Sequence, residues 1–175
     1  MPVILPSAFV TMPWKNGGGI TREIARQDKG DALLWRLSMA EVASDGPFSS
    51  FPGLMRILTV IRGAGLVLRT PDGVIEAEPF HPMRFAGDLA VDCSRIAGDV
   101  IDLNVIFDPV RIVARVMRLK GPEDWQASGP SAFLCLGGLV EADGQRLPEG
   151  AVALDPAALT LAPNGGGLLV TLDPI

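Results

Sequence analysis

The sequence predicts an all-β fold that consists of two successive antiparallel units packed in one domain of 175 residues. Twenty glycines and fifteen prolines separate many short apolar runs, which is typical of strands joined by tight turns. Within the runs, apolar and polar residues alternate with a period of two. The second half repeats this pattern without a polar linker, so we expect two packed barrels or sandwiches. The first unit spans about 9–108 and the second about 111–175.

The alternation in the first unit is clearest over the segment 32–42. It places Arg36 and Ser38 on the face opposite four apolar side chains: Leu33, Trp35, Leu37 and Met39. The segment 55–62 is apolar on both faces with arginine near its ends, which favours a strand inside a closed or two-layer sheet. These segments are therefore predicted to be strands.

Further strands are predicted on both sides of several turns. The segment Pro71-Asp72-Gly73 favours a hairpin, because proline presets φ and glycine accepts a positive φ. In the segment 99–107, Asp102 and Asn104 lie opposite an apolar face. The segment 110–119 joins the two units, and its pattern fits either a strand or a short helix. The remaining predicted strands are 66–69, 74–77, 83–85, 89–93, 132–136, 139–141, 151–154, 159–161 and 168–172.

Composition argues against several classes of protein. The net charge is −5, and the 15 basic residues are scattered singly, so no nucleic-acid partner is expected. No apolar run approaches the roughly 20 residues of a membrane helix, and the N-terminus lacks signal-peptide features. We therefore expect a cytoplasmic protein with no membrane partner. The two cysteines, Cys93 and Cys135, fit buried thiols in a reducing compartment.

The sequence offers few groups for metal or nucleophilic chemistry. His81 is the only histidine, whereas histidine-based metal sites on β-barrels need two or three such ligands. We expect no metal, no cofactor and no nucleophilic catalyst. Glu23 and Asp102 remain candidates for acid–base chemistry, although a carboxylate beside arginine is more often a structural partner, here of Arg36 or Arg56.

Polar residues concentrate in the first half, so a site is expected there. Arg36, Ser38, Arg56, Asp102 and Asn104 either converge in a barrel mouth or point into solvent, and the period alone does not separate the two. If these side chains face inward, they suit a carboxylate, because arginine is a planar bidentate donor.

The segment 14–24, WKNGGGITREI, is the most unusual local sequence. Its three glycines could let backbone amides approach an anion beside Lys15. The spacing matches neither the dinucleotide fingerprint nor the P-loop. A turn between two strands explains the glycines equally well.

The same segment carries a family resemblance. The stretches MPWKNGGGITREI (12–24), WRLSMA (35–40), DGPFSSFPG (45–53), FAGD (85–88) and DLN (102–104), together with Arg56 and Gly63-Ala64-Gly65, resemble the HutD/Ves family over about residues 9–108. The resemblance implies a cupin-like bicupin fold and a bacterial cytoplasmic protein associated with histidine utilisation. It also implies binding of a small acidic metabolite, such as formylglutamate or urocanate.

By this resemblance the ligand-binding candidates face inward, which replaces the solvent-facing interpretation of the arginines. They are Lys15, Asn16, Thr21, Glu23, Trp35, Arg36, Ser38, Phe48, Ser49, Arg56 and Asn104.

Three functional hypotheses follow. The first is a non-enzymatic sensor of a small carboxylate metabolite. The second is a metal-independent cupin enzyme, an isomerase or lyase, with Glu23 or Asp102 as base. The third is an assembly module that docks a protein partner, and a homodimer is compatible with each.

Overall fold

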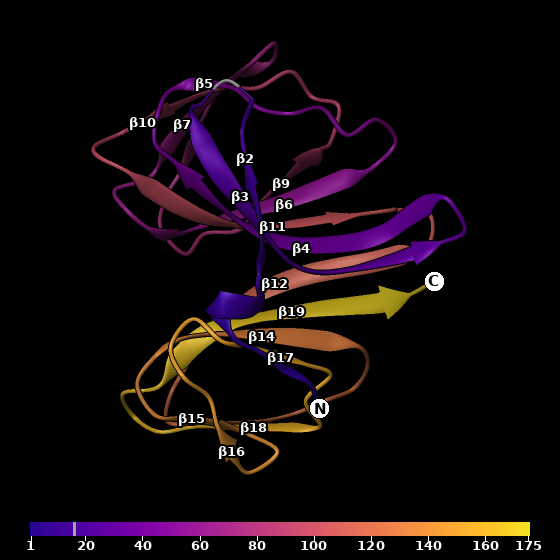
Figure 1. Ribbon diagram of the computed structural model, residues 1–175, viewed down its shortest axis with the longest axis vertical. Coiled ribbons are helices and arrows are strands. Elements are labelled where there is room, and N and C mark those ends of the chain that lie inside the picture. Colours follow the sequence, from indigo (N-terminus) through magenta and orange to yellow (C-terminus); the bar gives the residue numbers. More distant parts are fainter. Residues whose placement is uncertain (16) are drawn as a thin grey trace. The chain divides into compact units, whose positions relative to one another are not determined.

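A computed structural model describes residues 1–15 and 17–175, and its regular elements are strands apart from the 3-10 helix η1 (Pro6–Ala8). The all-β prediction is confirmed. Figure 1 shows the strands grouped into antiparallel sheets. The chain divides into two compact units: Val10–Arg111, called the central unit, and Met1–Phe9 with Ile112–Ile175, called the terminal unit.

The central unit contains a six-stranded and a four-stranded antiparallel sheet. The six-stranded sheet has the order β2 (Val10–Pro13), β3 (Gly19–Lys29), β4 (Ala32–Val42), β11 (Val100–Phe107), β6 (Met55–Arg62) and β9 (Met83–Ala86). The four-stranded sheet has the order β5 (Gly46–Pro47), β10 (Asp92–Arg95), β7 (Leu66–Thr70) and β8 (Gly73–Ala77). The predicted β7–β8 hairpin forms, and Gly73 has a φ of 139° at its turn.

A hydrophobic cluster fills the space within the central unit. It includes Leu58 and Val60 of β6, Leu66 and Leu68 of β7, and Cys93 of β10, all buried. These side chains come from both sheets, so the apolar residues of the alternating pattern pack between them. The same inner face of the six-stranded sheet carries the polar residues described below.

The terminal unit also contains two antiparallel sheets. One has the order β1 (Val3–Ile4), β17 (Val152–Leu154), β14 (Ser131–Gly137), β19 (Gly166–Pro174) and β12 (Ile112–Lys120). The other has the order β13 (Glu123–Gln126), β18 (Ala158–Leu161), β15 (Val140–Ala142) and β16 (Gln145–Arg146). The joining segment, which the sequence left open, is therefore a strand of this unit. Two units with two sheets each are compatible with the bicupin prediction.

The structure differs from the sequence-based boundaries at two places. The first nine residues belong to the terminal unit, because β1 pairs with β17. Strand β10 begins at Asp92 and not at Leu89, because the Leu89 amide donates to the Ala86 carbonyl at 3.1 Å and continues the preceding turn. Strands β1, β5 and β16 were not predicted, because two residues show no period. Strands β2, β3 and β13 were also not among the predicted ranges.

The place of β1 leads to a prediction on stability. Val3 packs against the cluster of Phe133, Leu159 and Leu169 in the terminal unit. We expect Val3→Asp to lower the free energy of unfolding by about 1–2 kcal/mol, because a carboxylate would replace an apolar contact. This corresponds to a melting temperature lower by roughly 2–8 °C in calorimetry. The control Val74→Asp alters a valine that is 65% exposed, and equal effects of both changes would contradict the role of β1.

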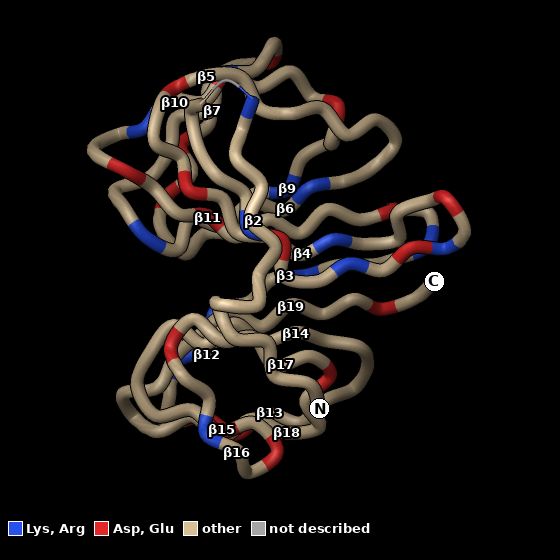
Figure 2. The backbone as a smooth tube through the Cα atoms, viewed as in Figure 1, with Lys and Arg blue, Asp and Glu red and all other residues tan. Residues whose placement is uncertain are grey.

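Lys and Arg residues lie singly along the chain, as Figure 2 shows. The turn end of the β3–β4 hairpin carries both signs, and Arg26 forms an ion pair with Asp28 there at 2.7 Å. No helix within residues 1–15 and 17–175 is long and apolar enough to cross a membrane.

Candidate functional site: a cationic cavity in the central unit

A cavity of about 530 Å³ opens in the central unit. Its size suits a small metabolite, since ligand pockets usually measure roughly 300–1,000 Å³. The wall combines aromatic rings, aliphatic groups, three cationic side chains and several hydroxyl or amide groups. The lining residues are Met12, Pro13, Trp14, Lys15, Thr21, Arg36, Ser38, Ala40, Pro47, Phe48, Ser49, Phe51, Arg56, Asn104 and Ile106.

Strand register places the polar groups of the cavity side by side. On β11, Asn104 pairs with Ser38 of β4. Two residues along the same strand, Ile106 pairs with Arg36 of β4 on one side and Arg56 of β6 on the other. Directly paired residues of an antiparallel sheet lie on the same face. The sheet therefore holds both arginines on the face that lines the cavity.

Arg56 is the most enclosed cation of the site, with 7% of its surface exposed. Its guanidinium carbon lies 4.4 Å from the centre of the Phe48 ring and 5.6 Å from that of Phe85. Its Nε donates a hydrogen bond to Asn104 Oδ1 at 2.6 Å. Burial lowers the pKa of Arg56 from its usual value, but arginine stays charged in proteins. The stacking and the Nε bond leave the terminal nitrogens as the part of the group that can meet a ligand.

Asn104 connects Arg56 to a buried carboxylate. Its Nδ2 donates a hydrogen bond to Asp102 Oδ1, while its Oδ1 accepts from Arg56. The amide is thus oriented with its acceptor toward the cation and its donor toward the anion. Asp102 has no exposed surface. Burial raises the pKa of Asp102 to about 6, although the Arg56 charge and the Asn104 hydrogen bond oppose this rise.

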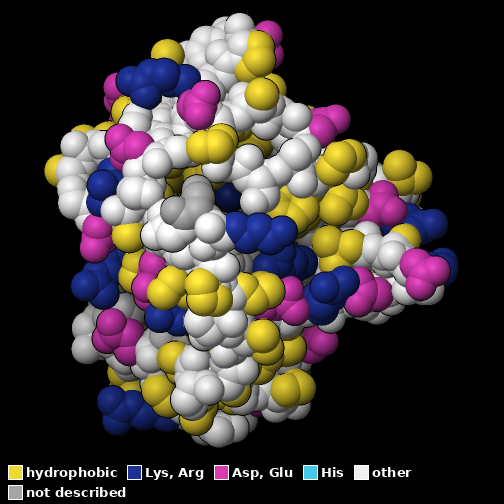
Figure 3. Space-filling model, turned by 45° about the horizontal axis from the view of Figure 1, so that its top comes forward, with side chains coloured by type: hydrophobic (Ala, Val, Ile, Leu, Met, Phe, Trp, Pro, Cys, Tyr) yellow, Lys and Arg dark blue, Asp and Glu magenta, His cyan; other side chains and the backbone are white. Residues whose placement is uncertain are grey.

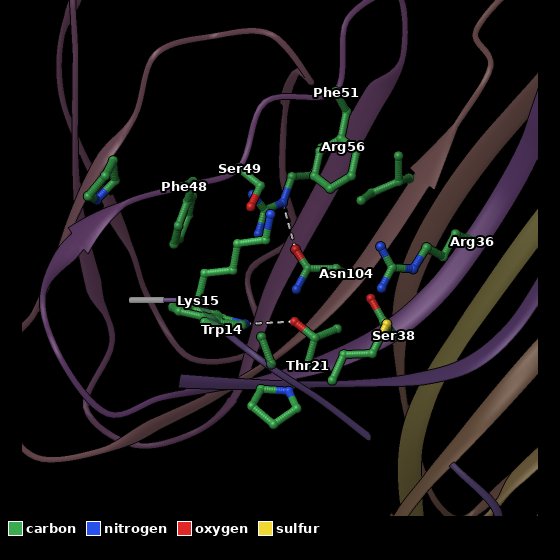
Figure 4. A pocket seen from close by; sticks show the side chains of 15 residues that line it. Trp14, Lys15, Thr21, Arg36, Ser38, Phe48, Ser49, Phe51, Arg56 and Asn104 are labelled. Carbon is green, nitrogen blue, oxygen red and sulfur yellow. Dashed lines mark hydrogen bonds between the residues drawn. The ribbon is translucent and has the colours of Figure 1, made fainter. Parts of the chain in front are cut away.

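Arg36 has a different environment. Its Nε lies 2.8 Å from Glu23 Oε2 of β3, without the alignment of a hydrogen bond. About a sixth of each side chain is exposed, 16% for Arg36 and 18% for Glu23. The sequence analysis gave Glu23 two roles, a catalytic base or a structural partner of an arginine. This ion pair corresponds to the second role. Figure 4 shows Arg36 beside Ser38, on the other side of Asn104 from Lys15 and Ser49.

The segment before β3 forms a further wall. Trp14 Nε1 donates to Thr21 Oγ1 at 2.8 Å, and the Trp14 amide donates to the Gly19 carbonyl at 2.9 Å. A Cβ on Gly19 would lie 3.0 Å from the indole ring and 2.3 Å from the Glu41 carbonyl oxygen. A side chain at this glycine would therefore displace the Trp14 wall. In Figure 4 the Lys15 side chain extends toward Arg56 and Ser49.

The cavity is electropositive. Lys15, Arg36 and Arg56 all line it, and within the described residues only Arg36 of the three forms an ion pair with a carboxylate. Figure 3 shows Lys and Arg side chains gathered beside a hollow on the face turned toward the viewer. Such a lining suits a small anion, above all a planar carboxylate. Among residues 1–15 and 17–175, no three His, Cys, Asp or Glu side chains group as metal ligands.

Most of the candidates chosen from sequence lie around this one cavity: Lys15, Thr21, Arg36, Ser38, Phe48, Ser49, Arg56 and Asn104. Trp35 and Glu23 do not line it. Trp35 alternates with Arg36 on β4, and its Nε1 donates to Gln27 Oε1 at 2.8 Å. Glu23 is held by Arg36. Asn16 lies outside the described residues.

Sequence reasoning missed seven lining residues: Met12, Pro13, Trp14, Ala40, Pro47, Phe51 and Ile106. Two of them carried a usable signal, because Ala40 and Ile106 continue the alternation of Arg36–Ser38 and Asn104. The others come from β2, β5 and the connections beside them, which show no periodic pattern.

Comparison with known proteins places the chain in a family. The HutD family model matches residues 6–172. An uncharacterised 21.2 kDa protein in the hutC 3′ region of Pseudomonas putida is 37% identical over 135 residues, which cover 72% of this chain and 68% of that protein.

Two solved structures are similar over nearly their whole length. HutD from Pseudomonas fluorescens SBW25 (formate condition) is 32% identical with a TM-score of 0.88, covering 99% of this chain and 98% of that chain. A conserved protein of unknown function from Pseudomonas aeruginosa PAO1 is 30% identical with a TM-score of 0.86, covering 98% of both chains.

A more distant likeness concerns the fold alone. A cupin 2 conserved barrel domain protein from Leptotrichia buccalis is 13% identical with a TM-score of 0.61, covering 93% of this chain and 92% of that chain. The fold is therefore cupin-like, and the family match extends beyond the stretches that carried the sequence resemblance. The chain belongs to the HutD family, which is associated with histidine-utilisation genes.

Proposed function

We propose that this chain is a non-enzymatic cytoplasmic sensor that binds a small carboxylate metabolite of histidine utilisation, formylglutamate or urocanate, and thereby modulates the pathway. The observation that carries the proposal is the cavity of about 530 Å³ with Lys15, Arg36 and Arg56 in its wall. Lys15 has no carboxylate partner among the described residues, and Arg56 reaches the carboxylate of Asp102 only through the Asn104 amide. A ligand carboxylate would be the anion in direct contact with both cations.

The shape of the lining supports the same ligand class. The Arg56 guanidinium lies over the rings of Phe48 and Phe85, and a guanidinium stacked on a ring keeps its N–H edge for a bidentate contact. Ser38 and Ser49 add hydroxyl groups, and Trp14, Phe48 and Phe51 add apolar surface for the rest of the molecule. The formate condition of the P. fluorescens HutD structure makes formate the natural minimal ligand to test.

The enzyme hypothesis has less support from the geometry. Its two candidate bases, Glu23 and Asp102, are absent from the cavity lining. Glu23 is paired with Arg36, and Asp102 lies behind Asn104 with no exposed surface. A base must come within hydrogen-bond reach of the proton that it removes, and neither carboxylate meets the cavity.

Calorimetric titration tests the proposal. The purified protein is titrated with formylglutamate, urocanate, glutamate and formate, and with formamide as the uncharged counterpart of formate. We expect formylglutamate or urocanate to bind with a dissociation constant below about 1 mM, weaker binding of formate, and no heat from formamide. Absence of heat with all four carboxylates, or equal binding of formate and formamide, would contradict the proposal.

A further inference from the structure

Asp102 is a charged group that the proposed binding function does not use directly. It has no exposed surface, and its Oδ2 has no hydrogen-bond donor among the described residues. Its Oδ1 accepts from Asn104, whose own oxygen accepts from Arg56. A carboxylate buried with one oxygen unpartnered is costly unless a nearby charge compensates it. Arg56 is that charge, and the side-chain amide of Asn104 links it to Asp102.

The surroundings of Asp102 contain few other titratable groups. Cys93 of β10 interacts with it electrostatically, but burial raises the pKa of this thiol to about 12, so the thiol remains neutral at physiological pH. The cross-strand neighbours of Asp102 are Ala40 on β4 and Val60 on β6, which carry no charge. Arg36 acts electrostatically on Arg56 and is itself paired with Glu23. Burial has the largest effect on the charge state of Asp102, and Arg56 is the charged group that opposes it most strongly.

We propose that Asp102 is the counterion of Arg56 in the empty cavity and takes up a proton from solvent when a ligand carboxylate binds Arg56. This inference rests on the proposed function. The ligand brings a second negative charge to a cation that already balances one. Of the two anions, the ligand is the one in direct contact, so Asp102 becomes the uncompensated charge. A proton on Asp102 removes that charge and offsets the charge of the one ligand carboxylate that binds Arg56.

Asp102 thus acts as a positioning residue whose effect reaches the ligand through Asn104 and Arg56. The raised pKa of Asp102, about 6 in the empty cavity, places the transition near physiological pH. The negative ligand raises this pKa further, because it opposes the effect of Arg56. Linkage then requires carboxylate affinity to fall as the pH rises from about 6 to 8, because binding is accompanied by proton uptake in that range.

Calorimetry in two buffers measures this proton directly. Titrations with formylglutamate and formate at pH 7, in Bis-Tris and in Tris, which are not anions, give the number of protons from the difference in buffer ionisation heat. We expect roughly half to one proton taken up per ligand, and an affinity that falls by up to about tenfold per pH unit. For Asp102→Asn we expect no uptake and a flat affinity between pH 6 and 8. His81→Gln is the control, since histidine titrates in this range, and should keep the uptake.

The outcomes separate the two proposals. If formylglutamate or formate binds the wild type without proton uptake at pH 6–8, the role of Asp102 is overturned and the binding function stands. The role of Asp102 is equally overturned if Asp102→Asn keeps the uptake, or if His81→Gln loses it. If no carboxylate binds at any pH, both proposals fail. The wild-type proton count is decisive even if Asp102→Asn does not fold, because it needs no variant.

Discussion

Arg56→Met is expected to abolish carboxylate binding. Arg56 is 7% exposed and its guanidinium contacts the rings of Phe48 and Phe85, so its charge acts on a ligand with little screening by water. Methionine keeps much of the apolar volume and removes the N–H donors. Losing one partner of a desolvated charge pair costs about 2–5 kcal/mol, which is roughly a 30-fold to several-thousand-fold weaker affinity. Calorimetric titration with formylglutamate measures the loss.

Two further variants separate this effect from general damage. Arg62→Met alters an exposed arginine on the same strand, β6, outside the cavity lining, and should bind like the wild type. Arg56→Lys keeps the charge but not the planar fork, so its affinity should lie between those of the wild type and Arg56→Met. Full binding by a folded Arg56→Met protein, judged by circular dichroism, would place the ligand elsewhere.

Strands β4 and β6 followed from the sequence because their signal is local, whereas β3 (Gly19–Lys29) was not among the predicted ranges. A period of two over 32–42 assigned Arg36 and Ser38 to one face, and β4 spans Ala32–Val42 with both residues in the cavity wall. The strand 55–62 was equally clear, and β6 spans Met55–Arg62. Long strands with one polar and one apolar face need no knowledge of their partners to be recognised.

The direction of those faces did not follow from the period. Alternation left open whether Arg36 and Arg56 point into a barrel or into water, and only the family resemblance favoured the inward interpretation. Whether two arginines share a cavity depends on strand register, here the pairing of Ile106 with both of them. Register is fixed by contacts distant in the sequence, so one sequence without its pairing partners does not contain it.

The polar network behind the cavity was also beyond local reasoning. The sequence suggested Asp102 as a partner of an arginine, but the structure inserts Asn104 between Asp102 and Arg56. Trp35, a candidate by resemblance, does not line the cavity. It stands next to Arg36 in the WRLSMA stretch, so resemblance carried both residues over, while the alternation of β4 places only Arg36 in the cavity. Two residues that are adjacent on a strand point to opposite faces of the sheet, so only one of them can line a cavity on a given face.

The buried carboxylate also makes stability depend on pH. The pKa of Asp102 is raised from 3.8 to about 6 in the folded protein, so the folded state holds this proton where the unfolded state has lost it. Between pH 4 and 6 the contribution of Asp102 to stability therefore decreases as the pH rises. About 2 pKa units correspond to about 3 kcal/mol of stability that is present below pH 4 and lost above pH 6.

Asp102→Asn removes the pH-dependent contribution of Asp102 to stability, because asparagine does not titrate. We expect the difference in free energy of unfolding, variant minus wild type, to increase by about 3 kcal/mol between pH 4 and pH 7. Using the difference cancels the titration of all other groups, such as Asp45, whose pKa is lowered by its hydrogen bond from the Arg95 backbone amide. Urea denaturation at pH 4, 5, 6 and 7 measures this difference.

The control variant Asp92→Asn alters an exposed aspartate of β10 and should follow the wild type at every pH. A pH-independent difference for Asp102→Asn would mean that Asp102 keeps the same proton affinity in the folded and unfolded chain, and that Arg56 compensates its burial fully.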